Sequence, residues 1–253
     1  MDQKKWQIVE KFLTKYKNKD YFIGAVLSGS YAAGNENENS DIDIYIIAND
    51  TIDWKEKGMK LIEGQLVEYF INPIGYIKKC LKEQQDNKGC LDIRMLSNCK
   101  IIMDNNGKIE ELVTEAKGLL EKGPNAPDDC TYKKNCYMVW SRFDELDLKY
   151  KRNQDIDFNY CIFLQEVINS YFQNKRIYKV GLCKIDFILK DENFKKNYNI
   201  GKKIDQKFLD LLLKCLNEKD RDNKYKCAKQ LYKYFKKEFS DFDINNYKAI
   251  KMI

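Results

Sequence analysis

The segment of residues 41–47 constrains the fold of this chain more than any other, because it alternates carboxylates with branched apolar residues. Side chains two positions apart on a β-strand point to the same face. Asp41 and Asp43 would therefore share one face of such a strand, and the isoleucines that alternate with them would share the other. Residues 41–47 thus predict a strand with two unlike faces.

The first hundred or so residues alternate patterns typical of helices and strands. Apolar residues recur at helical spacing near the N-terminus, and short branched apolar runs bounded by turn residues follow. Strands are predicted over residues 21–27, 41–47, 59–62, 65–71 and 100–103, and helices over residues 4–16 and 73–85, with a further helix after residue 107. The turn Glu63-Gly64 between two of these strands indicates a β-hairpin.

The pattern changes around residues 123–127, which hold two of the three prolines in the chain. Glycine and prolines in so short a stretch are typical of a linker. Beyond it, helical periodicity dominates, over residues 132–152, 158–174, 203–217 and 223–239. We therefore expect two domains, residues 1–122 with an α/β (α+β) fold and residues 128–253 with an all-helical fold.

Composition narrows the chemistry that this chain can perform. The 253 residues contain no histidine, which excludes histidine zinc sites and serine–histidine or cysteine–histidine catalysis. The nine cysteines are scattered without a C-x-x-C pair and are interpreted as reduced, small apolar residues. The net charge of +6 suits an anionic ligand such as a triphosphate, but does not by itself argue for nucleic acid.

Neither membrane insertion nor export is expected from the sequence. No run of about eighteen apolar residues occurs. The N-terminal residues become amphipathic at once and lack the apolar stretch of a signal peptide. A cytoplasmic location is the simplest expectation, with no membrane partner.

A turn precedes the acidic strand and completes a candidate site. The predicted strand over residues 21–27 ends in Ser28, Gly29 and Ser30, where glycine permits close approach of the backbone and a following helix would offer free amides to a phosphate. Two carboxylates about 6–7 Å apart on the next strand repel each other unless cations lie between them, and such hard oxygen ligands suit magnesium. This combination predicts a site that can hold two metal ions across one phosphoryl group.

A third carboxylate is needed to complete the ligands of one metal. Glu68 has apolar neighbours within residues 65–71, where a charge is costly unless it faces a cation or a polar cleft. Glu63 adjoins Gly64 at the predicted turn, where solvent is its simpler environment. We therefore favour Glu68 over Glu63.

The dipeptide Gly29-Ser30, followed after ten residues by Asp41-x-Asp43 in an apolar strand, resembles the signature of the polymerase-beta-type nucleotidyltransferase superfamily. Glu68 in a later strand is similar to the third acid of that family. The likeness covers roughly residues 21–110 and implies a domain with a small mixed sheet, followed by a helical domain. The layout is most similar to that of bacterial enzymes that modify aminoglycoside or lincosamide antibiotics.

This resemblance implies roles for individual residues. Gly29 and Ser30 would hold the triphosphate, Ser40 would contact a phosphate or cap the turn, and Asp41, Asp43 and Glu68 would be catalytic and bind two Mg²⁺ ions. The expected reaction moves a nucleoside monophosphate, AMP from ATP, to a hydroxyl of a small molecule and releases pyrophosphate. Toxin-like modification of tRNA or protein, and non-catalytic nucleotide binding, are the alternatives. The helical domain would bind the acceptor or form a homodimer.

Other polar residues are weaker candidates, and each has a structural interpretation beside a functional one. Lys184 interrupts an apolar stretch and could reach the triphosphate. Arg94 follows Asp92 on a predicted helix, where a salt bridge is favoured over a phosphate contact. A group of carboxylates on the helix over residues 132–152 is a solvated face or, alternatively, a contact for a cationic acceptor: Asp144, Glu145 and Asp147, near Arg142.

Overall fold

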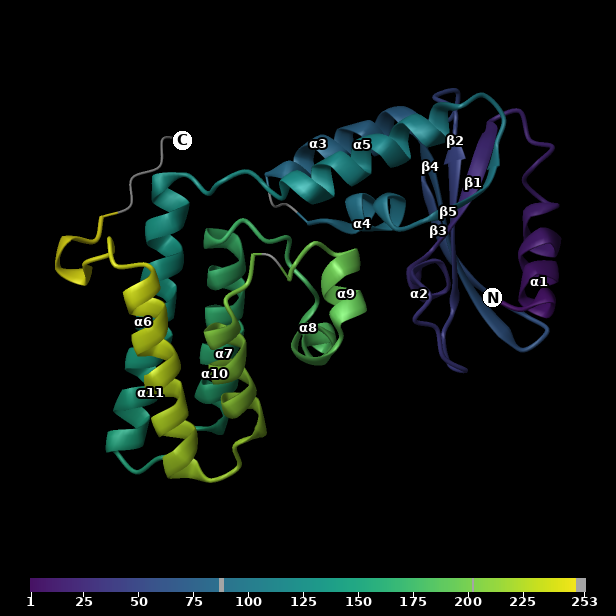
Figure 1. Cartoon of the computed structure of the whole chain (residues 1–253). Helices are drawn as coiled ribbons and strands as arrows, with labels where there is room; N and C mark the ends of the chain where they lie inside the picture. The colour runs from purple at the N-terminus through teal and green to yellow at the C-terminus, as the bar shows by residue number, and fades with distance from the viewer. Residues whose placement is uncertain (87–88, 202, 249–253) are drawn as a thin grey trace. The chain divides into compact units, whose positions relative to one another are not determined.

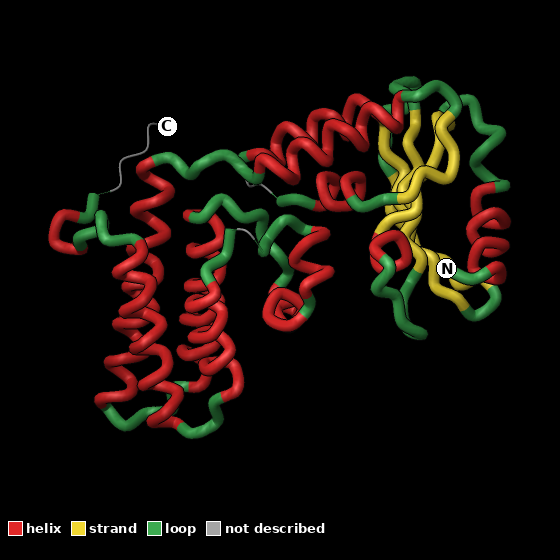
Figure 2. Tube along the Cα trace, in the orientation of Figure 1, coloured by secondary structure: helices red, strands yellow, loops and turns green. Residues whose placement is uncertain are grey.

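The computed structural model describes residues 1–86, 89–201 and 203–248 (Figure 1). The chain divides into two compact units, Met1–Gly123 and Pro124–Ile253. The strands belong to the first unit, whereas the described part of the second unit is built from helices and loops (Figure 2). The predicted fold class, an α/β (α+β) domain followed by helices, is thus confirmed.

The first unit is built on a five-stranded sheet with the strand order β3-β4-β2-β1-β5. Its strands are β1 (Phe22–Ser28), β2 (Ile42–Ala48), β3 (Glu56–Ile62), β4 (Gln65–Pro73) and β5 (Lys100–Asp104). Strands β2 and β4 run parallel and the other neighbours run antiparallel, so the sheet is mixed. The β3–β4 hairpin turns at Glu63 and Gly64, both with positive φ, as the sequence predicts.

Helices cover both faces of this sheet (Figure 1). They are α1 (Gln3–Leu13) on one face, α3 (Ile74–Gln85), α4 (Leu91–Ser97) and α5 (Lys108–Lys122) on the other, and the short α2 (Gly29–Ala33) directly after β1. Helix α1 begins where the Asp2 side chain accepts a hydrogen bond from the Lys5 amide, which is a typical N-cap. None of the helices in the described ranges is both long and apolar enough to cross a membrane.

Strand β2 has the two unlike faces that its sequence predicts. Three of its four isoleucines are buried in a core shared with α1: Ile42, Ile44 and Ile46. Each fully buried side chain of this size stabilises the fold by roughly 1.5–3 kcal/mol. Alternation along the strand directs Asp43 and Tyr45 to the opposite face.

The start of β2 differs slightly from the prediction. The ladder begins where Ile42 pairs with Val67 of β4, so Asp41 lies just before the strand and not within it. The backbone of Asp41 therefore belongs to the preceding loop, since no ladder pairing holds it.

A buried polar network lies on the face of the sheet opposite α1. The Tyr45 hydroxyl donates to Asp92 at 2.6 Å and accepts from the Asn72 amide at 2.7 Å. The Gln84 amide donates to the second carboxylate oxygen of Asp92 at 2.5 Å. Burial raises the pKa of Tyr45, so its hydroxyl stays protonated and can donate. These bonds tie α3 and α4 to β2 and β4.

The second unit contains the long helices that the periodicity predicts. They are α6 (Asp129–Lys151), α7 (Asp157–Asn174), α10 (Gln206–Asn217) and α11 (Arg221–Glu238). Helix α10 begins at Gln206, later than the predicted start at residue 203. The Asp205 side chain accepts a hydrogen bond from the Lys207 amide and caps the helix there. Shorter elements that the sequence analysis does not predict are η1 (Leu182–Lys184), α8 (Ile185–Lys190), α9 (Glu192–Asn197) and η2 (Ile244–Asn246).

Aromatic side chains hold the helices of the second unit together. The rings of Tyr171 and Phe208 stack with centroids 3.7 Å apart and join α7 to α10. The Tyr160 hydroxyl donates to the Cys215 carbonyl at 2.8 Å, which joins the same two helices through a buried polar contact. The second unit therefore has a core of its own, as a separately folded domain requires.

The buried network predicts the cost of removing one hydroxyl. Tyr45→Phe leaves the buried Asp92 and Asn72 without a shared partner, so we expect the free energy of unfolding to fall by about 1–3 kcal/mol. Chemical denaturation followed by circular dichroism measures the loss. Tyr69→Phe is the matched control: its hydroxyl bonds the exposed Glu56, which water can solvate instead, so the loss should be about 1 kcal/mol or less. Equal losses in the two variants would contradict the network's role.

Candidate active site

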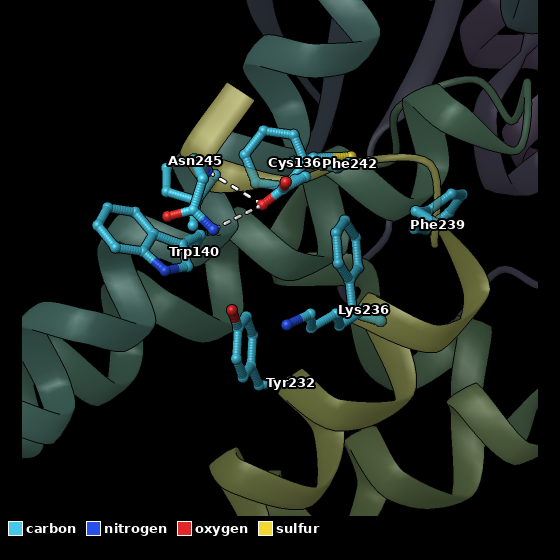
Figure 3. A pocket seen from close by; sticks show the side chains of 10 residues that line it. Cys136, Trp140, Tyr232, Lys236, Phe239, Phe242 and Asn245 are labelled. Atoms are coloured by element: carbon cyan, nitrogen blue, oxygen red, sulfur yellow. Dashed lines mark hydrogen bonds between the residues drawn. The ribbon is translucent and has the colours of Figure 1, made fainter. Parts of the chain in front are cut away.

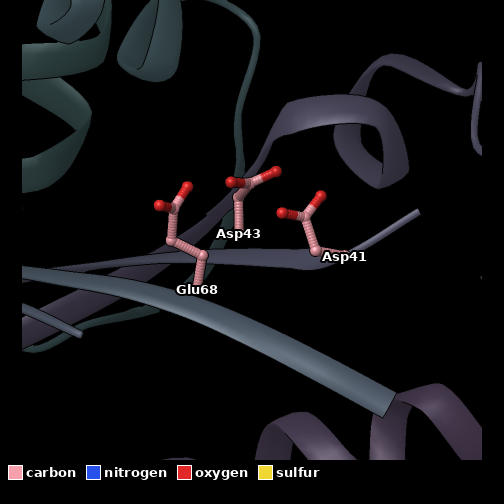
Figure 4. A group of neighbouring side chains, drawn as sticks. All are labelled: Asp41, Asp43 and Glu68. Carbon is pink, nitrogen blue, oxygen red and sulfur yellow. The ribbon is translucent and has the colours of Figure 1, made fainter. Parts of the chain in front are cut away.

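Three carboxylates come together at the start of β2 (Figure 4). One oxygen from each of Asp41, Asp43 and Glu68 lies within 4.8 Å of the others, and all three residues are half-buried. Asp43 stands opposite Glu68 in the parallel register of β2 and β4. The structure thus brings together the three residues that the sequence selects as metal ligands.

The charges of this cluster favour a bound cation. At a separation of 4.8 Å, two carboxylates repel each other by roughly 3 kcal/mol at the effective dielectric constant near a protein surface. Carboxylate oxygens are hard ligands, and Mg²⁺ binds them together with phosphate oxygens and water. The donor set therefore fits the metal that the family resemblance implies.

A lysine already contacts the cluster. Lys57 Nζ lies 2.8 Å from a Glu68 carboxylate oxygen and 5.0 Å from the centroid of the Phe70 ring. Lys57 pairs with Phe70 across the β3–β4 ladder, so it reaches Glu68 diagonally. Lys57 is not among the residues predicted from the sequence, although the turn at Glu63 and Gly64 fixes the hairpin register and could have revealed this contact.

Gly29 lies directly beside Asp43. Ser28, the last residue of β1, pairs with Asp43, and Gly29 follows with a φ of 64°. A Cβ at this position would lie 1.8 Å from Asp43 Oδ2, so glycine alone avoids both the overlap and the left-handed strain. The Ser28 hydroxyl donates to the Met95 carbonyl at 3.0 Å, which fixes the end of β1 against α4.

The other residues predicted to bind the nucleotide have different surroundings. Ser30 is half-buried on α2. The Ser40 hydroxyl accepts a hydrogen bond from the Asn37 amide at 2.9 Å and closes a local turn in the loop before β2. Lys184 is exposed in η1 of the second unit. Nucleotide binding by these three residues stays a prediction.

The acidic group on α6 makes contacts within its own unit. Glu145 pairs with Arg142 at 3.0 Å. Asp147 accepts a hydrogen bond from the Tyr225 hydroxyl at 2.5 Å and pairs with Lys151. These partners fit the interpretation of a solvated helix face, and contact with a cationic acceptor stays a prediction.

A small cavity lies in the second unit beside α6, α11 and η2 (Figure 3). Aromatic side chains form much of its lining, among them Trp140, Tyr232 and Phe242. Its volume of about 120 Å³ is below the roughly 300–1,000 Å³ of typical small-molecule sites. The acid cluster is therefore the stronger candidate for the active site.

Residues 10–106 match the family model described as Polymerase beta, Nucleotidyltransferase. This range contains Gly29, the three clustered carboxylates and all five strands of the sheet. The match therefore assigns the domain that carries the sheet to the nucleotidyltransferases. The first unit of this chain carries a nucleotidyltransferase domain of the polymerase beta family, and the second unit lies beyond the matched range.

A comparison with solved structures found a weak likeness. A nucleotidyltransferase-like protein from Exiguobacterium sibiricum is similar over 92% of this chain and 74% of its own, with 12% sequence identity and a TM-score of 0.44. No curated protein matches this chain. The family assignment rests on residues 10–106 alone.

The contact between Gly29 and Asp43 predicts the effect of one added methyl group. Gly29→Ala should displace the Asp43 carboxylate and weaken Mn²⁺ binding by about tenfold or more, as measured by calorimetry. Gly34→Ala is the matched control, because Gly34 also has positive φ, 72°, but a Cβ there meets nothing within 4 Å. Both variants carry similar backbone strain, so equal metal affinities would refute the steric explanation.

The contact between Lys57 and Glu68 predicts a change in the opposite direction. Lys57→Met removes a positive charge that competes with the metal, so Mn²⁺ affinity should rise by about two- to fivefold, the range expected for an exposed ion pair. Lys60→Met removes the same charge from the other face of β3, where Lys60 lies over the rings of Tyr16 and Tyr69. An equal rise in both variants would indicate a general charge effect and contradict a specific contact.

Proposed function

We propose that the protein is a Mg²⁺-dependent enzyme that transfers a nucleoside monophosphate, AMP from ATP, to a hydroxyl group of a small molecule such as an aminoglycoside or lincosamide antibiotic. The observation that carries this proposal is the clustering of Asp41, Asp43 and Glu68 within 4.8 Å beside Gly29. A set of metal-binding acids here adjoins a glycine turn that can approach a phosphate closely.

Each residue of the site has a role in this proposal. Asp41 and Asp43 would hold the metal ions, and Glu68 would complete the ligands of one of them. When bound, such ions would neutralise charge on the triphosphate and lower the pKa of the acceptor hydroxyl. Gly29 and Ser30 hold the triphosphate next to the acids.

The covalent step follows from these roles. The acceptor hydroxyl oxygen forms a bond to the α-phosphorus, and the bond between that phosphorus and the pyrophosphate oxygen breaks. Pyrophosphate leaves with the electron pair, and the hydroxyl proton passes to Glu68. Because the protein has no histidine, a carboxylate is the natural proton acceptor at neutral pH.

Pyrophosphate release tests the proposal. The protein is incubated with Mg²⁺ and each of the four ribonucleoside triphosphates, together with aminoglycosides, lincosamides or bulk tRNA. Release that requires ATP and one small acceptor is the expected result. Release with tRNA alone would favour the toxin-like function, and no release with any pair would count against enzymatic transfer.

Variants of two of the three acids test the roles directly. Asp43→Asn and Glu68→Gln should lower the transfer rate by roughly 100-fold or more, the loss typical for a group that stabilises the transition state. Glu63→Gln is the control, since Glu63 lies in the hairpin turn and pairs with Lys11 at 2.6 Å. Steady-state pyrophosphate release measures all three variants. Loss of activity in Glu63→Gln with retention in Glu68→Gln would show that the third acid is misassigned.

A further inference from the structure

An exposed apolar surface adjoins the acid cluster on the β3–β4 hairpin. Met59 is 59% exposed, Leu61 is 73% exposed and Leu66 is 39% exposed. The described residues of the first unit include six exposed large hydrophobic side chains, and half of them are these three. We refer to Met59, Leu61 and Leu66 as the apolar platform. Single exposed apolar residues are ordinary, whereas a contiguous group is typical of a binding surface.

The strand register places the apolar platform on the face that carries Glu68. Leu61 pairs with Leu66, and Met59 pairs with Glu68. Directly paired residues of an antiparallel ladder share a face, with Cβ atoms about 4.5–5.5 Å apart. The other face of β3 carries Lys60, whose ammonium lies over rings that pack with α1. Glu68 therefore stands at the edge of the platform.

The strand order separates the platform from the side proposed for the triphosphate. Gly29 and Ser30 follow β1, which pairs with one side of β2, whereas Glu68 lies on β4, which pairs with the other side. In phosphoryl transfer the attacking and leaving oxygens are roughly in line. With the leaving pyrophosphate at Gly29 and Ser30, the acceptor hydroxyl approaches from the side of β4 and β3, which carries the platform.

The charge beside the platform discriminates among acceptors. Lys57 shares this face, and its ammonium lies 2.8 Å from Glu68. The residues of β3 that face this way are Lys57, Met59 and Leu61, so the strand adds a positive charge and apolar surface but no carboxylate. With Asp41, Asp43 and Glu68 assigned to the metal ions, no further carboxylate of β3 faces a polycation here, so a polycation is disfavoured. An acceptor with an apolar face and little positive charge is complementary.

We infer that the apolar platform binds the acceptor, and that the acceptor is an amphipathic alcohol with an apolar face beside its reacting hydroxyl. The inference rests on the proposed nucleotidyl transfer and narrows its acceptor. Compounds with the character of lincosamides fit this surface, whereas polycationic aminoglycosides do not.

Methyl NMR tests the binding surface without requiring turnover. The chain contains six methionines, and Met59→Leu identifies the Met59 signal in protein labelled with ¹³C-methyl methionine. Lincomycin and kanamycin are titrated separately into the full chain with Mg²⁺ and an ATP analogue that cannot be cleaved at the α-phosphate. Lincomycin should shift the Met59 signal, while kanamycin leaves it in place. Met103 of β5 serves as an internal reference in the same unit.

Kinetics test whether the platform contributes to the reaction. Leu61→Ser should raise the KM for lincomycin by about tenfold, the effect of losing one apolar contact of this size, and leave the KM for ATP unchanged. Ile101→Ser is the matched control, because Ile101 is also an exposed apolar residue, 42% exposed, but lies on β5 at the opposite edge of the sheet. It should leave both constants unchanged.

The two readouts separate this inference from the proposed function. Transfer to lincomycin without a Met59 shift, or with an unchanged KM in Leu61→Ser, would overturn the inference and leave nucleotidyl transfer intact. A lincomycin-dependent Met59 shift without any transfer would support the platform and contradict the proposed reaction. A shift with kanamycin alone, or with neither compound, would overturn the inference.

A Met59 shift that depends only on protein concentration would assign the surface to a second copy of the chain, and would overturn the inference too.

Discussion

The parallel pairing of β2 with β4 is the constraint on which the first unit depends. It sets Asp43 beside Glu68, an arrangement that electrostatic repulsion opposes by roughly 3 kcal/mol. On the other face the same two strands bury Ile44 and Ile46 against α1, and each such side chain contributes roughly 1.5–3 kcal/mol. The core on one face thus outweighs the repulsion on the other.

The two sides of the acid cluster differ in chemistry. On the side of β1, the absence of a side chain at Gly29 lets the backbone lie directly beside the Asp43 carboxylate. On the side of β3, Lys57 and the apolar platform form a surface with few hydrogen-bonding groups. A transferase needs this kind of asymmetry, because its donor and its acceptor meet one reaction centre from opposite directions.

Local patterns in the sequence predicted the parts of this structure that local physics determines. The alternation around Asp43 predicted the strand and its two faces, and the turn at Gly64 predicted the hairpin. The structure places Glu68 beside Asp41 and Asp43, and its role as the third metal ligand stays a prediction. Local patterns could not predict contacts between segments that are distant in the sequence. Tyr45 and Asp92 are 47 residues apart, and no periodicity reveals that α4 packs against β2. To predict the contact of Lys57 with Glu68, the residue pairing of the β3–β4 hairpin must be known. The helices α8 and α9 are too short to show a helical period in the sequence.

The parallel register also protects the site against a specific folding error. A slip of one residue between β2 and β4 would turn Glu68 towards α1 and bring Tyr69 to the acid face, because side chains alternate along a strand. Tyr69 now packs against Phe12, with ring centroids 5.0 Å apart, so the slipped chain would lose core contacts at the same moment as it lost an acid. The same core packing that stabilises the domain therefore also selects the register in which all three acids meet.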